Sequence, residues 1–127
     1  MKNEKMMAMT IQIEEAAITA LSIYFLTKYS LGLSPWIWAV LFFSPDLSML
    51  GYLVNTRFGA FTYNLVHHRG IAIGLIAAGI VTGLAPLTAS GLLLLAHSSF
   101  DRMLGYGLKF GDDFKHTSLG WMGKARN

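Results

Sequence analysis

The sequence predicts an all-α protein that folds as a four-helix transmembrane bundle, with residues 1–127 forming one integral membrane domain. Of the 127 residues, 54% are hydrophobic and only 13% are charged, whereas about a quarter of the residues in soluble domains are charged. Residues 71–96 carry no charge, and a run of that length can cross a hydrocarbon core of about 30 Å. Several ionisable residues nevertheless interrupt the apolar stretches. Such residues are costly within a membrane, so they are the first candidates for a functional site.

The first two helices are expected over roughly 10–31 and 36–54. Trp36 and Trp38 stand at the start of the second helix, as aromatic residues do at a membrane interface. Pro45 lies inside that helix and predicts a kink there, because proline cannot donate the helical hydrogen bond.

The third and fourth helices are expected over roughly 58–82 and 86–109, since Gly83 and Pro86 divide the long uncharged run. The third helix has small residues that allow close approach of a neighbouring backbone, at Gly70, Gly74 and Gly79. The remaining residues, 110–127, form a polar tail that we expect at the membrane interface.

Positive charges predict the orientation in the membrane. An even number of spans puts both termini on one side, and only Lys28 then falls on the opposite side. We therefore expect both termini in the cytoplasm, in a multi-pass membrane protein. The first residues lack the order of charged, apolar and small residues of a secretory signal, so we expect no removable signal peptide.

Composition also excludes several kinds of site. The chain has no cysteine, which excludes disulfides, thiolate nucleophiles and thiolate zinc sites. The net charge of +3 is not arranged in a basic stripe between aromatic residues, so we expect contact with membrane lipids and no binding of nucleic acid.

The ionisable residues of different helices fall at a similar predicted depth. Counted from the expected helix ends, Asp46, His67 and His97 each lie roughly 14–16 Å into the membrane at a rise of about 1.5 Å per residue. Asp101 lies deeper on the fourth helix, near the predicted level of Glu14. Because ionisable residues of different helices are expected at a similar depth, the sequence predicts that they share a polar site near mid-membrane.

Spacing suggests which side chains share a face. His97 and Asp101 are separated by four residues, so they lie one above the other on one helix. Tyr63 and Asn64 share a face of the third helix with His67, whereas the adjacent His68 points about 100° away. This geometry favours His67 as the inward imidazole. Alternatively, the His97–Asp101 pair is only a hydrogen bond within the bundle, and His68, with Arg69 beside it, contacts lipid headgroups.

Asp46 directly follows Pro45, which leaves the carbonyl four residues earlier without its usual donor and free to act as an oxygen ligand. Ser44 and Ser48 are alternative partners for that carbonyl. For the Asp46 carboxylate itself, the main structural alternative is a salt bridge to Arg102 or Arg69.

Two carboxylates and at least two imidazoles suit a divalent ion such as Zn²⁺, Mn²⁺ or Fe²⁺. Glu14 or Glu15 would add a ligand or a general base. A purely structural polar network explains the same residues equally well.

The stretches "FFSPDLSMLGY", "YNLVHH" and "AHSSFDRMLGYGLKF" together resemble a family of small bacterial integral membrane proteins known as domain of unknown function 4260. The resemblance runs roughly from Glu14 to Gly120 and implies a membrane bundle with no assigned activity. The family motif after Phe-Lys is Asp-Thr-His-Leu-Gly, whereas this chain has His116 and Ser118 at the Asp and His positions.

A fainter similarity is to membrane-bound metal-dependent hydrolases of the YdjM type, which carry a Pro-Asp motif, a His-Arg-Gly motif and a later His-x-x-x-Asp motif. The counterparts here are Pro45-Asp46, His68-Arg69-Gly70 and His97 with Asp101. This similarity implies a hydrolase and favours His68 over His67.

The leading hypothesis is a metal-dependent hydrolase of a lipid-linked or amphipathic substrate. Asp46, His67 or His68, His97 and Asp101 would hold the metal. Glu14 would act as base, Arg102 or Arg69 would hold an anionic group, and Asn64 would contact the substrate. The alternative is a non-enzymatic channel, carrier or assembly partner, which would need a homo-oligomer because four short helices form a thin wall.

Overall fold

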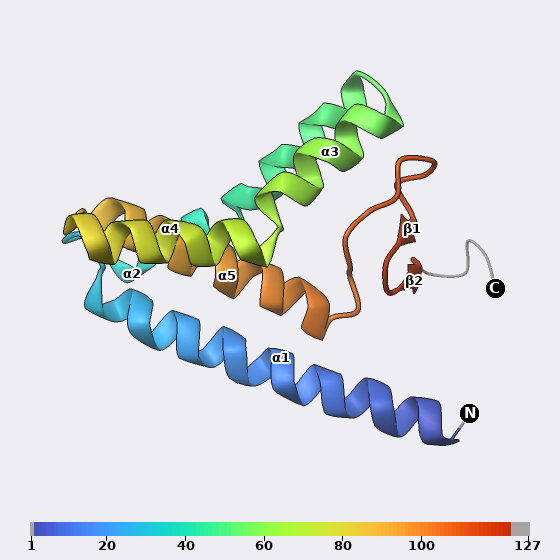
Figure 1. The fold of residues 1–127 in the computed structure, drawn as a ribbon, viewed down its shortest axis with the longest axis horizontal. Coiled ribbons are helices and arrows are strands. Elements are labelled where there is room, and N and C mark those ends of the chain that lie inside the picture. Colours follow the sequence, from blue (N-terminus) through green and yellow to red (C-terminus); the bar gives the residue numbers. More distant parts are fainter. Residues whose placement is uncertain (1, 123–127) are drawn as a thin grey trace.

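The computed structural model describes residues 2–122 and confirms a predominantly helical protein (Figure 1). The elements are α1 (Lys2–Lys28), α2 (Pro35–Phe42), the 3-10 helix η1 (Ser44–Leu53), α3 (Thr56–Val66), α4 (Arg69–Thr82), α5 (Ala85–Met103), β1 (His116–Thr117) and β2 (Gly120–Trp121).

The first helix begins earlier than the sequence predicts. It was expected from residue 10, but α1 starts at Lys2, because the first turns contain good helix formers and no glycine or proline. The helix ends at Lys28, and Leu31 and Gly32 then take positive φ angles in the loop that leads to α2.

The second predicted helix divides into α2 and η1. The kink expected at Pro45 is present, but it extends into a change of helix type. Asp46 N donates to the Phe43 carbonyl at 3.2 Å, the i to i+3 pattern of a 3-10 helix. The predicted α-helix over 36–54 is therefore α-helical only in its first half.

The third predicted helix divides at the two adjacent histidines. His67 is the C-cap of α3, and His68 is the N-cap of α4, where its Nδ1 accepts a hydrogen bond from Gly70 N at 3.0 Å. The chain changes direction there, and α3 points away from the α4–α5 pair (Figure 1). The prediction of one helix over 58–82 is therefore wrong at His67 and His68, where the structure has a break between α3 and α4.

Helix α5 lies at the centre and packs against both α1 and α4, while η1 packs against α3. The buried core combines Leu26 of α1 with Ala89, Leu92 and Leu93 of α5. Gly91 allows the close approach of α5 to α4, because a Cβ there would lie 2.6 Å from the Ala72 carbonyl. The helix ends at Met103, six residues before its predicted end.

The predicted polar tail is partly folded. After α5 the chain forms the β1–β2 hairpin, with His116 opposite Trp121 and Thr117 opposite Gly120. Asn64 of α3 fastens this segment: its amide donates to Lys109 O at 2.8 Å and accepts from Lys109 N at 2.7 Å. The rest of the predicted tail, residues 123–127, lies outside the described residues.

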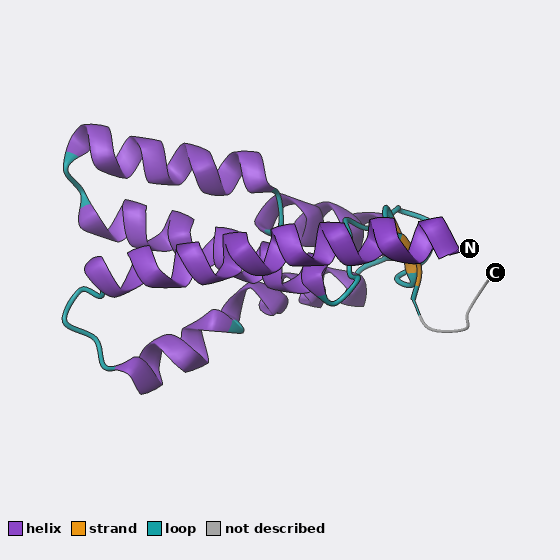
Figure 2. Ribbon diagram, turned by 90° about the horizontal axis from the view of Figure 1, so that it is seen from below, coloured by secondary structure: helices purple, strands orange, loops and turns teal. Residues whose placement is uncertain are grey.

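Three segments of the described chain are long and apolar enough to cross a membrane, namely Lys2–Lys28, Pro35–Leu53 and Thr56–Thr82. The α1–α2 and α4–α5 loops lie at one end of the molecule, and the start of α1 and the β-hairpin lie at the other (Figure 2). The fourth predicted span, α5, is the central helix, and its His97, Ser98 and Ser99 are buried. Its passage through a membrane stays a prediction, as does the side on which the termini lie.

Candidate metal centre

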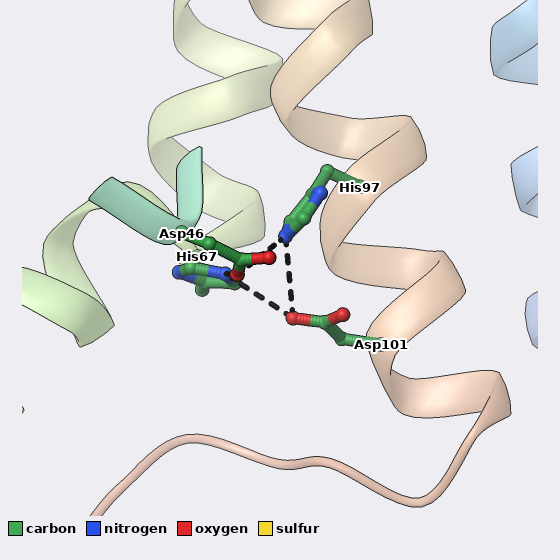
Figure 3. A group of neighbouring side chains, drawn as sticks. All are labelled: Asp46, His67, His97 and Asp101. Carbon is green, nitrogen blue, oxygen red and sulfur yellow. Dashed lines mark hydrogen bonds and ion pairs between the residues drawn. The ribbon is translucent and has the colours of Figure 1, made fainter. Parts of the chain in front are cut away.

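Four side chains from separate parts of the chain meet beside the two helix breaks (Figure 3). Asp46 comes from the first turn of η1, His67 from the end of α3, and His97 and Asp101 from successive turns of α5. One ligand atom of each residue lies within 4.8 Å of the others, and the group could hold a metal ion.

The distances between imidazoles and carboxylates resemble those of a tetrahedral site. His67 Nε2 lies 3.2 Å from Asp101 Oδ2 and 3.6 Å from Asp46 Oδ1. His97 Nε2 lies 3.1 Å from Asp46 Oδ1 and 3.4 Å from Asp101 Oδ2. Zinc bonds of about 2.0–2.1 Å in tetrahedral geometry place ligand atoms roughly 3.4 Å apart. These four edges therefore match a small cation at the centre.

Backbone carbonyls determine how each imidazole is protonated. The Phe42 carbonyl lies 2.6 Å from His97 Nδ1, and the Tyr63 carbonyl lies 2.8 Å from His67 Nδ1. A carbonyl oxygen only accepts, so each Nδ1 carries a proton and donates it. In the neutral ring the Nε2 atom then presents a lone pair, and both lone pairs face carboxylate oxygens. This is the second-sphere arrangement that orients histidine ligands in metal sites.

Burial differs sharply between the four groups. The side chains of His67 and His97 are 3% and 1% exposed, that of Asp101 is 14% exposed, and that of Asp46 is 39% exposed. The centre is therefore closed on the histidine side and accessible to solvent or substrate on the Asp46 side.

Tyr63 and Lys109 complete the wall around the centre. The Tyr63 ring stacks on His67 at 3.8 Å between centroids, and its hydroxyl donates to Asp101 Oδ2 at 3.3 Å. The Lys109 ammonium lies 4.8 Å from the centroid of the Tyr63 ring and donates to Phe114 O at 2.9 Å. Burial lowers the pKa of Lys109 below its ordinary value.

Other residues predicted for the site lie outside the group of four. His68 is exposed and caps α4, so it does not take the place of His67 in the group, as the motif similarity implied. Glu14 is exposed on α1, whereas the neighbouring Glu15 is buried and forms an ion pair with Arg69. The structure thus gives Arg69 a carboxylate partner from α1, not Asp46.

Asn64 and Arg102 border the centre without belonging to it. Both hydrogen-bonding groups of the Asn64 amide are taken by the backbone of Lys109, so its role is to anchor the C-terminal segment. Arg102 Nη2 donates to His67 O at 3.4 Å and thereby reaches the break between α3 and α4.

Sequence reasoning missed the carbonyl that orients His97. The carbonyl four residues before Pro45 belongs to Leu41, and the Ser44 hydroxyl donates to it at 2.6 Å, the alternative raised above. The carbonyl that serves the site is that of Phe42, one residue further on. Tyr63 was expected on the same helix face as His67, four residues away, and in the structure the two rings stack.

Fold and site together define a helical protein with segments of membrane-spanning length and a central group of two histidines and two aspartates. The family model described as "Domain of unknown function (DUF4260)" matches residues 8–122. The chain belongs to this family, which confirms the resemblance found in its motifs. No curated protein and no solved structure matches the chain.

Proposed function

We propose that this protein is a multi-pass protein of a bacterial inner membrane that binds a divalent metal ion at Asp46, His67, His97 and Asp101 and hydrolyses an amphipathic or lipid-linked substrate. One observation carries the proposal: two imidazole lone pairs, each fixed by a carbonyl on the opposite ring nitrogen, face two carboxylates. Lone pairs and anions repel one another, and a shared cation removes the repulsion.

The geometry at His67 favours a metal over extra protons. Protonated Nε2 atoms would also neutralise the carboxylates, but such a proton needs an aligned acceptor. His67 Nε2 is buried and makes no hydrogen bond among the described residues, although Asp101 Oδ2 lies 3.2 Å away. A metal between the atoms does not require the N–H to point at the oxygen.

The donor set is compatible with Zn²⁺, Mn²⁺ or Fe²⁺. Four protein ligands fill a tetrahedral site, so a bound water would take a fifth coordination position. The exposed Asp46 carboxylate marks the side from which water or substrate would reach the metal. When bound, the metal would supply Lewis-acid activation of water and of the scissile group.

Two protein side chains then have roles in hydrolysis, one as the general base and one in stabilising negative charge. Oδ1 of Asp46 contacts both imidazoles, and this proposal assigns Oδ2 to accept the proton of the attacking water. The water oxygen bonds to the ester carbon or phosphorus, the bond to the leaving oxygen breaks, and the proton passes to that oxygen. Arg102 stabilises the negative charge that develops. Because Glu14 lies on the exposed face of α1, this proposal assigns the base to Asp46 instead.

Metal content tests the first half of the proposal. The detergent-purified protein is loaded with each candidate ion, desalted and measured by mass spectrometry, with an expected ratio of about one metal per chain. His97→Ala and His67→Ala should lose the ion. His68→Asn is the matched control, because asparagine keeps an N-cap on α4 and the site is untouched. No stoichiometric metal in the wild-type protein, or retention in His97→Ala, would refute metal binding.

Hydrolysis is tested separately on metal-loaded protein with amphipathic esters and phosphoesters. Cleavage should require the metal and should fall by at least about 100-fold in Asp46→Asn, the usual scale for removal of a general base. A protein that holds its metal but cleaves none of these substrates would refute the hydrolase and leave the metal site standing.

A second candidate function is a homo-oligomeric channel or carrier in which the same groups relay protons. It is favoured by the charge balance, since two imidazoles and two carboxylates with two additional protons are neutral without any metal. Proton flux into liposomes that disappears in Asp46→Asn, from protein without metal, would support it over hydrolysis.

A further inference from the structure

Two arginines lie side by side next to the centre. Arg69 opens α4 and Arg102 lies in the last turn of α5, and their charges are close enough to repel each other. Arg69 has one carboxylate partner, Glu15. Arg102 has a single long hydrogen bond, to the His67 carbonyl.

Both guanidinium groups have hydrogen-bond donors left over. Arg69 Nε and Arg102 Nη1 are buried and have no hydrogen-bond partner among the described residues. A buried charged donor without a partner is costly, and two in one place indicate a missing anion. The planar fork of arginine matches the oxygens of phosphate in particular.

The structure also has an apolar cleft of about 700 Å³. It lies between α1, α2 and the end of α5, and its lining includes Thr19, Thr27, Trp38, Phe42 and Phe100. Thr19 and Thr27 are eight residues apart on α1, so the cleft follows that helix for about 12 Å, long enough for an alkyl chain of medium length.

One end of the cleft approaches the arginine pair along α1. Thr19, which lines the cleft, is one helical turn from Glu15, the partner of Arg69, and lies on the same face of the helix. At the same end, the Phe100 ring of α5 contacts that of Phe42. The apolar wall on α1 therefore ends one helical turn from the carboxylate that pairs with Arg69.

We propose that the cleft and the arginine pair bind a single molecule, an amphiphile with one alkyl chain and a phosphate headgroup, and that this is the substrate class of the proposed hydrolase. The headgroup would be held by Arg69 and Arg102 beside the metal, and the chain would lie along α1. The inference rests on the proposed function for its catalytic meaning, but the binding itself can be measured without turnover.

Charge balance couples this binding to the metal. The six charged groups around the site are three cations and three carboxylates, namely Arg69, Arg102, Lys109, Glu15, Asp46 and Asp101. They cancel, so a divalent ion leaves a local charge of about +2. A phosphate headgroup should accordingly bind more tightly to the loaded protein than to the metal-free protein.

Calorimetric titration of the purified protein with dodecyl phosphate, dodecanol and inorganic phosphate tests the proposal. Dodecyl phosphate should bind at least tenfold more tightly than either of the others, and tenfold more weakly to Arg102→Gln. Arg57→Gln, which removes an exposed arginine, should match the wild type. Ala39→Phe, which fills the cleft, should weaken binding of dodecyl phosphate and leave inorganic phosphate unchanged.

Two outcomes would overturn the inference: equal affinity for dodecyl phosphate and dodecanol, as for a lipid that merely coats the helices, or unchanged affinity in Arg102→Gln. Arg102→Lys keeps the charge but loses the fork, and it provides the same comparison if the glutamine variant does not fold. Metal content is measured on every sample. A loaded protein without phosphate preference refutes the amphiphile alone. A protein that takes up no metal on loading but keeps the preference refutes the metal centre alone.

Discussion

The packing of α4 on α5 sets the position of His67 relative to His97, and two glycines, Gly79 of α4 and Gly91 of α5, permit it. A Cβ at Gly91 would lie 2.6 Å from Ala72 O and 2.7 Å from Ile76 N, and both atoms belong to the α4 backbone. Ordinary contact starts at 3.4 Å, so Gly91→Ala must push the helices apart. Overpacking of this kind costs about 1–3 kcal/mol. Gly74→Ala is the matched control, because a Cβ at Gly74 meets nothing within 4 Å.

Both variants gain the same helix propensity on replacement of glycine by alanine, about 0.5–1 kcal/mol. The difference between them therefore isolates the clash and should be about 1–3 kcal/mol. It is measured by denaturant unfolding of the two proteins in the same detergent, followed by circular dichroism. Metal affinity should fall in Gly91→Ala and not in Gly74→Ala. Equal unfolding free energies of the two variants would refute the packing of α4 on α5 described above.

Three further predictions concern the surroundings of the centre. Asn64→Ala removes two hydrogen bonds to the C-terminal segment and should cost about 1–3 kcal/mol, with faster amide exchange over residues 108–118; unchanged exchange would contradict this anchoring role. Glu15→Gln leaves a partly buried arginine without its ion pair and should destabilise the fold by about 1–3 kcal/mol, whereas Glu14→Gln should have no effect in the same unfolding assay. His116 lowers the pKa of Asp112 through a hydrogen bond, so the carboxylate contributes stability that is lost as pH falls through that lowered pKa; His116→Ala should raise the Asp112 pKa in an NMR titration, and an unchanged pKa would exclude the hydrogen bond in solution.

Much of the centre could be predicted because depth along a helix is a simple count. Asp46, His67 and His97 were expected at one level from the rise per residue alone, and the structure gathers them. His67 was preferred over His68 from the face it shares with Tyr63 and Asn64, and His67 is the buried one. The preference for His67 used only residues that precede it on the same helix. It therefore remained correct although the helix ends at His67.

Rotation of the helices about their own axes could not be predicted. Gly70, Gly74 and Gly79 were expected to allow close packing, yet only Gly79 meets a neighbouring helix, at Thr88. The glycine of α5 that approaches the α4 backbone, Gly91, was not recognised. The pairing of Arg69 with Glu15 was missed for the same reason, because two residues 54 positions apart meet only once the rotation of both helices is known.

The break in the second predicted helix supplies the carbonyl that orients His97. In a continuous α-helix the Phe42 carbonyl would accept from Asp46 N, four residues later. Pro45 shifts the chain into a 3-10 helix, and Asp46 N donates to Phe43 O instead. The Phe42 carbonyl is thereby left for His97 Nδ1, while the same shift turns Asp46 toward His97 Nε2. One proline thus frees the acceptor that fixes the imidazole tautomer and places the carboxylate that faces its lone pair, so the sequence "SPD" specifies half of the centre.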